Sequence, residues 1–272
     1  MIKGDKKVIR GWVSYDWANS VYNLVISSAV FPIFFEKTTT NAYVNRMYND
    51  GSPDFDPSMI SVRTEDVTSF FFGIEITSSV LYTYVLAASF LVVSFLSPLL
   101  SGIADYSGNK KAFMKFFCYL GATSCVGLYF FDPNNMGLSM IPFFLASIGF
   151  WSSLVFYNSF LPEISEPKDH DRISAKGFSM GYFGGMVLLV FCLIWNMVLE
   201  YDIKYCFVFV GIWWVLFSQI AYRVLPNSTN NYKKEKGIIW KGFNELIIVF
   251  KAFKKTKRLK RFITSFFFFN TG

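Results

Sequence analysis

The sequence predicts an all-α membrane protein with six membrane-spanning helices, and three observations carry this prediction. Of the 272 residues, 53% are hydrophobic and 20% are aromatic. Long stretches contain no Asp, Glu, Lys, Arg or His, namely residues 17–35, 76–104, 137–161, 177–199 and 205–222. Each stretch is close to the roughly 20 apolar residues that a helix needs to cross the bilayer core. The stretches are apolar nearly all round, unlike helices of a soluble bundle, and they lack the alternating polarity of membrane β-strands.

The six predicted spans form a bundle over residues 1–225, and the charged segments between them set their boundaries. The predicted spans are residues 14–35, 78–103, 112–131, 137–161, 177–199 and 205–225. The third span is included because the Lys115 side chain can extend its ammonium group to the membrane interface. Residues 37–77 are rich in Thr, Asn, Asp and Pro, which predicts a long loop outside the membrane.

Two segments follow the predicted bundle. Residues 226–261 form a basic connector, with apolar residues at helical spacing. These apolar residues are Ile239, Phe243, Leu246, Phe250 and Phe253. They predict an amphipathic helix on the cytoplasmic surface, with a solvated basic linker as the alternative. Residues 262–272 begin a seventh hydrophobic run, but eleven residues make only about 16 Å of helix against a core of about 30 Å. We therefore expect the chain to be a truncated product or a fragment.

Positive charge is concentrated on one side of the predicted membrane. Segments 1–12, 104–115, 162–176 and 222–261 together hold 22 Lys and Arg residues, whereas the opposite-side segments hold 4. Cytoplasmic loops carry the excess of Lys and Arg, so the N-terminus and the connector are predicted to be cytoplasmic. The same distribution accounts for the net charge of +7 without a nucleic-acid partner.

The most specific motif follows the second span, where residues 100–111 read Leu-Ser-Gly-Ile-Ala-Asp-Tyr-Ser-Gly-Asn-Lys-Lys. It combines small residues, which let helices approach closely, with the acid Asp105 and a turn at Gly108. Lys110 and Lys111 then open the next helix. The acid can face the positive N-terminus of a neighbouring helix, and the lysines can meet anionic head groups. The alternative is an ordinary turn that follows the charge rule.

This motif resembles the loop between helices two and three of the major facilitator superfamily, whose pattern is Gly-x-Leu-Ala-Asp-Arg-x-Gly-Arg-Arg/Lys. The matching residues are Ala104, Asp105, Gly108 and Lys110. The departures are Ser101, Ile103, Tyr106 and Asn109. The resemblance implies a conformational switch at Asp105, Gly108, Lys110 and Lys111. The departures weaken its charge network and leave Asp105 as the surest member.

Four further blocks resemble the branch that contains bacterial permeases and the fungal vacuolar amino-acid effluxer linked to autophagy. The blocks are Tyr-Asp-Trp-Ala-Asn-Ser-Val-Tyr at 15–22, Tyr-Asn-Ser-Phe-Leu-Pro-Glu-Ile at 157–164, Gly177 with Met-Gly-Tyr-Phe-Gly-Gly at 180–185, and Phe-Phe-Phe-Asn-Thr-Gly at 267–272. The resemblance implies a twelve-helix transporter of two halves. This chain would supply the first half, and its missing partner would be the C-terminal half. It also implies export or uptake of a small solute, foremost amino acids, in the bacterial inner (plasma) membrane.

Polar residues in the first and fourth spans are the candidates for a substrate cavity. One face of the first span carries Asp16, Asn19, Ser20, Asn23 and Ser27, and the fourth span carries a sparser stripe of Ser147, Trp151 and Asn158. Polar groups in a membrane are costly, so they usually face the bundle interior or a wet cavity. The candidate cavity residues are Asp16, Asn19, Tyr22, Asn23, Trp151 and Asn158. The alternatives are hydrogen bonds between helices for Asn19 and Asn158, and a helix-dipole contact for Asp16.

Other residues indicate packing, or limit the chemistry. Gly177, Gly181 and Gly185 recur every four residues on the fifth span, which predicts close helix packing. Glu163 either joins a charge network with Arg172 or is solvated. The sequence contains no nucleotide-binding Gly-x-x-x-x-Gly-Lys-Ser/Thr loop. It has a single histidine, and its cysteines do not have metal-ligand spacing. We therefore predict no catalytic residue, no metal and no cofactor.

These observations favour a secondary transporter that works by alternating access, with its site near the bilayer midplane. The alternative function is a non-transporting six-helix membrane scaffold or assembly partner. A membrane-embedded enzyme is a third class.

The predicted topology can be tested by cysteine labelling. In a cysteine-free background, Ser52→Cys and Asn230→Cys are expected to react with a membrane-impermeant thiol reagent from opposite sides of the membrane. The physical reason is the asymmetry of Lys and Arg described above. Labelling of both positions from the same side would contradict the six-span topology.

Overall fold

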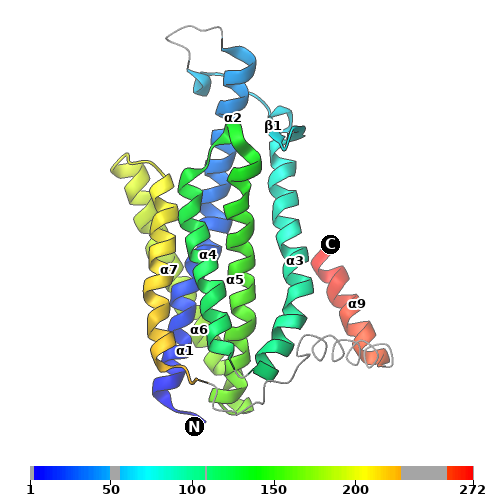
Figure 1. Ribbon diagram of the computed structural model, residues 1–272, viewed down its shortest axis with the longest axis vertical. Helices are drawn as coiled ribbons and strands as arrows, with labels where there is room; N and C mark the ends of the chain where they lie inside the picture. Colours follow the sequence, from blue (N-terminus) through cyan, green and yellow to red (C-terminus); the bar gives the residue numbers. More distant parts are fainter. Residues whose placement is uncertain (1–2, 50–55, 108, 228–255, 272) are drawn as a thin grey trace.

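Helices dominate the computed structural model, which describes residues 3–49, 56–107, 109–227 and 256–271. In this described part, six helical spans are long and apolar enough to cross a membrane, and they run side by side in one bundle (Figure 1). The spans are Lys6–Tyr48, Ser78–Leu100, Lys110–Phe130, Pro133–Ile164, Pro167–Val198 and Lys204–Val224. The predicted all-α membrane fold is confirmed.

The first span is one long helix in three parts. It runs through α1 (Lys6–Val21), the π-helix η1 (Tyr22–Val30) and α2 (Phe31–Tyr48). The wide turns of η1 end just before Pro32, which has no N–H to donate and crowds the preceding turn. The Ser28 hydroxyl donates to the carbonyl of Asn23, five residues earlier, at 2.8 Å. The irregular part of the span therefore lies directly before the proline, which cannot donate a backbone hydrogen bond.

The structure differs from the loop expected at residues 37–77, because α2 continues as a helix to Tyr48. The stretch after Glu36 contains no Gly or Pro up to Tyr48, so nothing in it ends the helix where the membrane ends. Two short 3₁₀ turns follow, η2 (Pro57–Met59) and η3 (Thr64–Asp66). Hydrogen bonds from the Ser58 hydroxyl and then the Ser58 amide hold the pKa of the Asp56 carboxyl below its usual value.

A small β-hairpin completes this segment and lies at the end of α3 away from the N-terminus (Figure 1). Strand β1 (Thr68–Phe71) pairs antiparallel with β2 (Ile74–Thr77), with Phe71 opposite Ile74. Phe72 and Gly73 form the two-residue turn with φ of 48° and 85°. Positive φ at both positions is the mark of a type I′ turn, whose twist matches that of the strands.

The remaining elements follow in chain order. They are α3 (Ser78–Ser107), α4 (Lys110–Gly127), η4 (Leu128–Phe130), η5 (Pro133–Asn135), α5 (Met136–Ile164), η6 (Pro167–Asp169), α6 (His170–Leu193), the π-helix η7 (Ile194–Val198), α7 (Lys204–Val224) and α9 (Lys257–Thr271), of which α9 is not one of the six spans. The amphipathic helix expected around residues 239–253 lies outside the described residues. Helix α9 covers most of the expected seventh hydrophobic run and starts inside the basic segment before it.

Glycines let α4 cross its neighbours at close range. A side chain on Gly149 of α5 would place its Cβ only 2.5 Å from the backbone nitrogen of Gly121 on α4. A Cβ on Gly211 of α7 would lie 2.6 Å from the carbonyl oxygen of Ala122. Helices in membranes gain much of their association energy from such close contact, so α4 is the helix that holds α5 and α7 together.

Gly149→Leu is therefore expected to destabilise the bundle, because the α4 backbone cannot move aside like a flexible side chain. Overpacking costs about 1–3 kcal/mol or more. Thermal unfolding of the detergent-purified chain measures the effect. Gly127→Ala is the control, since its Cβ would meet Pro142 at an ordinary 3.4 Å. An unchanged unfolding temperature for Gly149→Leu would contradict the packing.

Candidate substrate cavity

A cavity of about 200 Å³ lies between α1, η1, α5 and α6. Its polar lining comes from the first span, and its apolar lining comes mainly from the other two helices. The lining residues are Asp16, Asn19, Ser20, Asn23, Leu24, Phe150, Trp151, Leu154, Phe178, Gly181 and Tyr182. The lining includes one carboxylate and no cation, so the cavity is suited to a polar or cationic group rather than to an isolated anion.

Asp16 is the most buried charge-bearing group of the cavity, with 6% of the residue exposed. The Tyr157 hydroxyl on α5 donates a hydrogen bond to its Oδ2 at 2.7 Å. Trp12 fixes this tyrosine from behind, because the two rings stack with centroids 4.2 Å apart and planes 11° from parallel. The Trp12 indole N–H also donates to the Tyr157 carbonyl at 2.9 Å. Asp16 is thus held in place from α5 and leaves its remaining acceptor capacity for the cavity.

Asn19, which lines the cavity, carries an unpaired buried donor. The residue is 1% exposed, and its Nδ2 has no hydrogen-bond partner among the described residues. Its Oδ1 accepts a hydrogen bond from the Ser20 hydroxyl at 3.3 Å. A buried amide nitrogen without a partner is costly, so such groups in native proteins usually meet a water or a ligand. The position of Asn19 in the lining makes it the strongest indication of a bound polar solute.

The glycine face of α6 determines how close that helix comes to the cavity. A Cβ on Gly177 would collide with the Asp16 carboxylate, and one on Gly181 would collide with the Ser20 hydroxyl. A Cβ on Gly185 would lie 3.0 Å from the Leu24 side chain. All three glycines for which the sequence predicts packing therefore face the first span, and Gly181 also lines the cavity.

Two predicted cavity residues lie elsewhere. Tyr22 is buried on another face of the first span, where its ring packs 4.9 Å from Phe150 and 6.0 Å from Trp214. Asn158 is exposed and is not part of the lining. The structure thus brings Asp16, Asn19, Asn23 and Trp151 together, and leaves Tyr22 and Asn158 outside.

Several cavity residues are not among the sequence candidates. Tyr157 lies next to Asn158 in the sequence, but its bond to Asp16 depends on how α1 and α5 pack. Phe178 and Tyr182 form an aromatic rim on α6 and are 65% and 72% exposed. Their spacing of four residues on one helix face is the only sequence signal for that rim.

The two lysines of the 100–111 motif make charged contacts at the end of the bundle that contains the N-terminus. Lys110, at the start of α4, forms an ion pair with Glu163 at 2.7 Å, and its side chain is 10% exposed. The Lys111 ammonium donates to the Leu225 carbonyl at 2.9 Å and to Asn227 Oδ1 at 3.1 Å. A cation on the last carbonyls of a helix is favourable, so Lys111 caps α7. The two lysines join α4 to α5 and to α7.

The other switch residues are described less fully. The backbone of α3 includes Asp105, whereas its side chain and all of Gly108 lie outside the described part. Glu163 does not pair with Arg172, which contacts Asp169 at 2.7 Å instead. The reason is local geometry, because Asp169 and Arg172 are three residues apart at the start of α6.

Comparison with known proteins identifies the family. The family described as vacuole effluxer Atg22 like matches residues 4–272. An uncharacterized MFS-type transporter of Bacillus subtilis is 27% identical, and the alignment covers 100% of this chain and 59% of that relative. Autophagy-related protein 22 of Coccidioides immitis is 21% identical, over 78% of this chain and 47% of the relative.

Autophagy-related protein 22-1 of Aspergillus fumigatus is also 21% identical, with 78% of this chain and 50% of the relative covered. The chain thus spans about half the length of the curated relatives it matches. No solved structure matches the chain. Together with the six spans, the match over nearly all residues shows that the chain belongs to the Atg22-like family of major-facilitator-type permeases, and that it is a multi-pass membrane protein.

Proposed function

We propose that this chain forms the first half of a secondary transporter that moves a small polar solute by alternating access. The observation that carries the proposal is the cavity between α1, α5 and α6, whose lining includes a held carboxylate and a residue with an unpaired buried amide nitrogen. Polar groups at membrane depth are retained where they bind or relay a solute. The names of the matched family and relatives, effluxer and transporter, support the same class.

Amino acids are the proposed solutes, for two reasons. Asp16 can accept hydrogen bonds from an ammonium group, and the Asn19 amide can donate to a carboxylate. The free volume of about 200 Å³ suits a small solute rather than a drug-sized one. The carboxylate of an amino acid would meet no cationic side chain in this lining. We therefore expect a second half to supply the rest of the amino-acid binding site.

The exposed rim supports the need for a second half. Phe178 and Tyr182 are large, exposed and part of the cavity lining, so the cavity is open beside them and a second half could cover it there. We place the protein in a bacterial plasma membrane with its N-terminus on the cytoplasmic side, on the charge asymmetry of the sequence.

Flux measurements test the proposal. Proteoliposomes that contain this chain together with a complementary C-terminal half, taken from a relative, are expected to show saturable flux of amino acids. Proteoliposomes with the 272-residue chain alone are expected to show none, since alternating access needs two halves that close against each other. Flux by the chain alone would contradict the two-half mechanism. No flux with either preparation, for any amino acid, would favour a scaffold.

Asp16→Asn tests the cavity in the same assay. The substitution keeps the shape but removes the charge, and a hydrogen bond to a charged group is worth about 1.5–3 kcal/mol, so flux at low solute concentration should fall about tenfold or more. Glu65→Gln is the control, because this exposed acid pairs only with Arg63 far from the cavity. Equal flux in Asp16→Asn and the control would exclude a solute-binding role for Asp16.

Asp105→Asn tests the proposed switch. We expect impaired flux at nearly normal expression, because loss of a charge-assisted contact of about 1–3 kcal/mol would shift a two-state equilibrium by one to two decades. Asp171→Asn is the matched control, an exposed acid in the first turn of α6. Wild-type flux kinetics in Asp105→Asn would dismiss the switch.

A further inference from the structure

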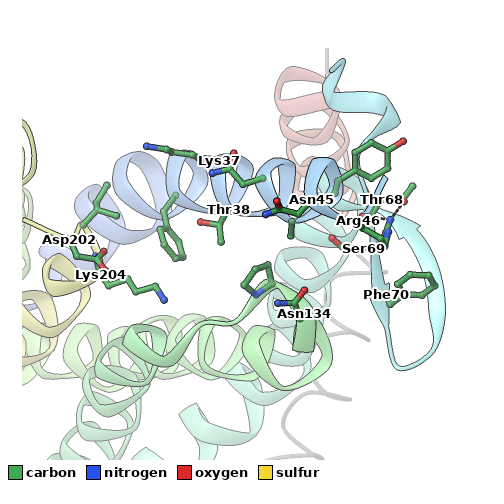
Figure 2. Close-up of a pocket in the computed structure, with 16 residues that line it drawn as sticks. Lys37, Thr38, Asn45, Arg46, Thr68, Ser69, Phe70, Asn134, Asp202 and Lys204 are labelled. Atoms are coloured by element: carbon green, nitrogen blue, oxygen red, sulfur yellow. Dashed lines mark hydrogen bonds between the residues drawn. The ribbon is translucent and has the colours of Figure 1, made fainter. Parts of the chain in front are cut away.

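A second and larger cavity lies at the other end of the bundle, beyond the membrane-spanning part of the first helix. It has a volume of about 710 Å³ and lies between α2, the β-hairpin, the start of η5 and the loop before α7 (Figure 2). On α2 most of the lining residues alternate at steps of three and one, along one helix face, and Tyr43 lies beside that face. The residues on the face are Phe34, Lys37, Thr38, Asn41, Ala42, Asn45 and Arg46. The family match and the proposed transport mechanism assign nothing to it.

The charges at this end of the bundle are distributed unevenly between the cavity and the remaining surface. Segments 36–78, 132–137 and 200–204 contain four described cations, of which three line the cavity. They also contain eight described acids, of which only Asp202 lines the cavity. The cations are Lys37, Arg46 and Lys204 in the cavity and Arg63 outside it. The cavity is therefore positive on an otherwise acidic surface, and such clefts concentrate small anions.

The three cations are not equally available. Arg46 is bound to the hairpin, where its Nη2 donates to Thr68 Oγ1 at 2.8 Å and lies 3.5 Å from Glu75 Oε1. The Lys204 ammonium donates to the Phe131 carbonyl at 3.0 Å, which uses one of its three N–H groups. Lys37 is exposed and forms no ion pair with any described residue. Lys37 and Lys204 are thus the cations that can bind an anion.

Amide groups accompany these cations. Asn41 and Asn45 lie on the cavity face of α2, and Asn134 faces them from η5 (Figure 2). Asn134 uses its Nδ2 on Asp132 at 3.2 Å, whereas the side chains of Asn41 and Asn45 have no hydrogen-bond partner in the described part. Amides can donate to and accept from a polar organic body, which favours an organic anion over a bare inorganic ion.

We propose that this cavity binds a small water-soluble organic carboxylate, with Lys37 and Lys204 as its cationic partners. The cavity near Asp16 has the opposite character, with one carboxylate and no cation in its lining. The two sites therefore select different charges, and this inference does not depend on transport.

Asp202 is the feature that makes the proposal sharply testable. Its Oδ1 accepts a hydrogen bond from the Lys204 backbone nitrogen at 2.9 Å, at the start of α7. The side-chain oxygen of Asn can accept the same hydrogen bond from a backbone nitrogen two residues on, so Asp202→Asn keeps this contact and removes the single negative charge of the lining. A carboxylate should then bind more tightly, which is a gain that misfolding cannot produce.

The experiment is isothermal titration of the purified 272-residue chain in neutral detergent. The probe is succinate, and succinamide of the same shape but without charge is the comparison. Succinate is expected to bind in the millimolar range, and its affinity is expected to fall as NaCl rises from about 0.05 to 0.5 M. Succinamide is expected not to bind. Lys37→Gln and Lys204→Gln should each weaken succinate about tenfold, and Asp202→Asn should strengthen it several-fold.

Arg63→Gln is the matched control, because this cation of the same surface pairs with Glu65 and Asp66 outside the cavity. It should leave succinate binding unchanged. Equal losses in Arg63→Gln and Lys37→Gln would reduce the effect to general surface charge and overturn the site. The site would also be overturned if succinamide bound as well as succinate, or if inorganic phosphate bound more tightly. A third such result would be no heat of binding at about 10 mM succinate.

Discussion

The hydrogen bond between Tyr157 and Asp16 is the contact on which the central part of the structure depends. It joins α1 to α5 at 2.7 Å, and the Trp12 stack keeps the tyrosine ring in position. Helix α6 then closes over the same carboxylate, which is possible only because Gly177 has no side chain. Three helices thus meet at one buried acid. A bilayer offers no water to such a group, so its position and its partners have to be fixed by the protein itself.

Sequence alone predicts the spans well, because hydropathy directly reflects the thickness of the membrane core. It predicts the length of the first helix poorly, since hydropathy ends near Phe35 while nothing in the following sequence stops the helix before Tyr48. The sequence alone also does not predict the hairpin. The strand Thr68–Phe71 is only four residues long and half polar, and it depends on a turn in which Phe72 adopts positive φ.

Helix geometry explains which cavity candidates lie in the cavity. At 100° per residue, Asn19, Ser20 and Asn23 stay within about 60° of Asp16 around the helix axis, whereas Tyr22 lies about 120° away and enters the core. Asn158 is on the same face of α5 as Trp151 but about 10 Å further along it, which is beyond a cavity of this size. The bond from Tyr157 could not be predicted, because it depends on the relative rotation of two helices.

The two cavities are lined by one continuous helix, and this places a constraint on how they can act. Asn23 in the cavity near Asp16 and Lys37 in the larger cavity are fourteen residues apart, which is about 21 Å at the α-helical rise. A straight α-helix would transmit any rotation at one cavity to the other. The π-helix η1 starts at Tyr22, within the stretch that lines the cavity near Asp16, and ends at Val30, before the lining of the larger cavity begins. Turns that are not α-helical therefore connect the two linings. A change of bend along η1 would therefore move the part of the first span that carries Asp16 relative to α2, which packs against the hairpin.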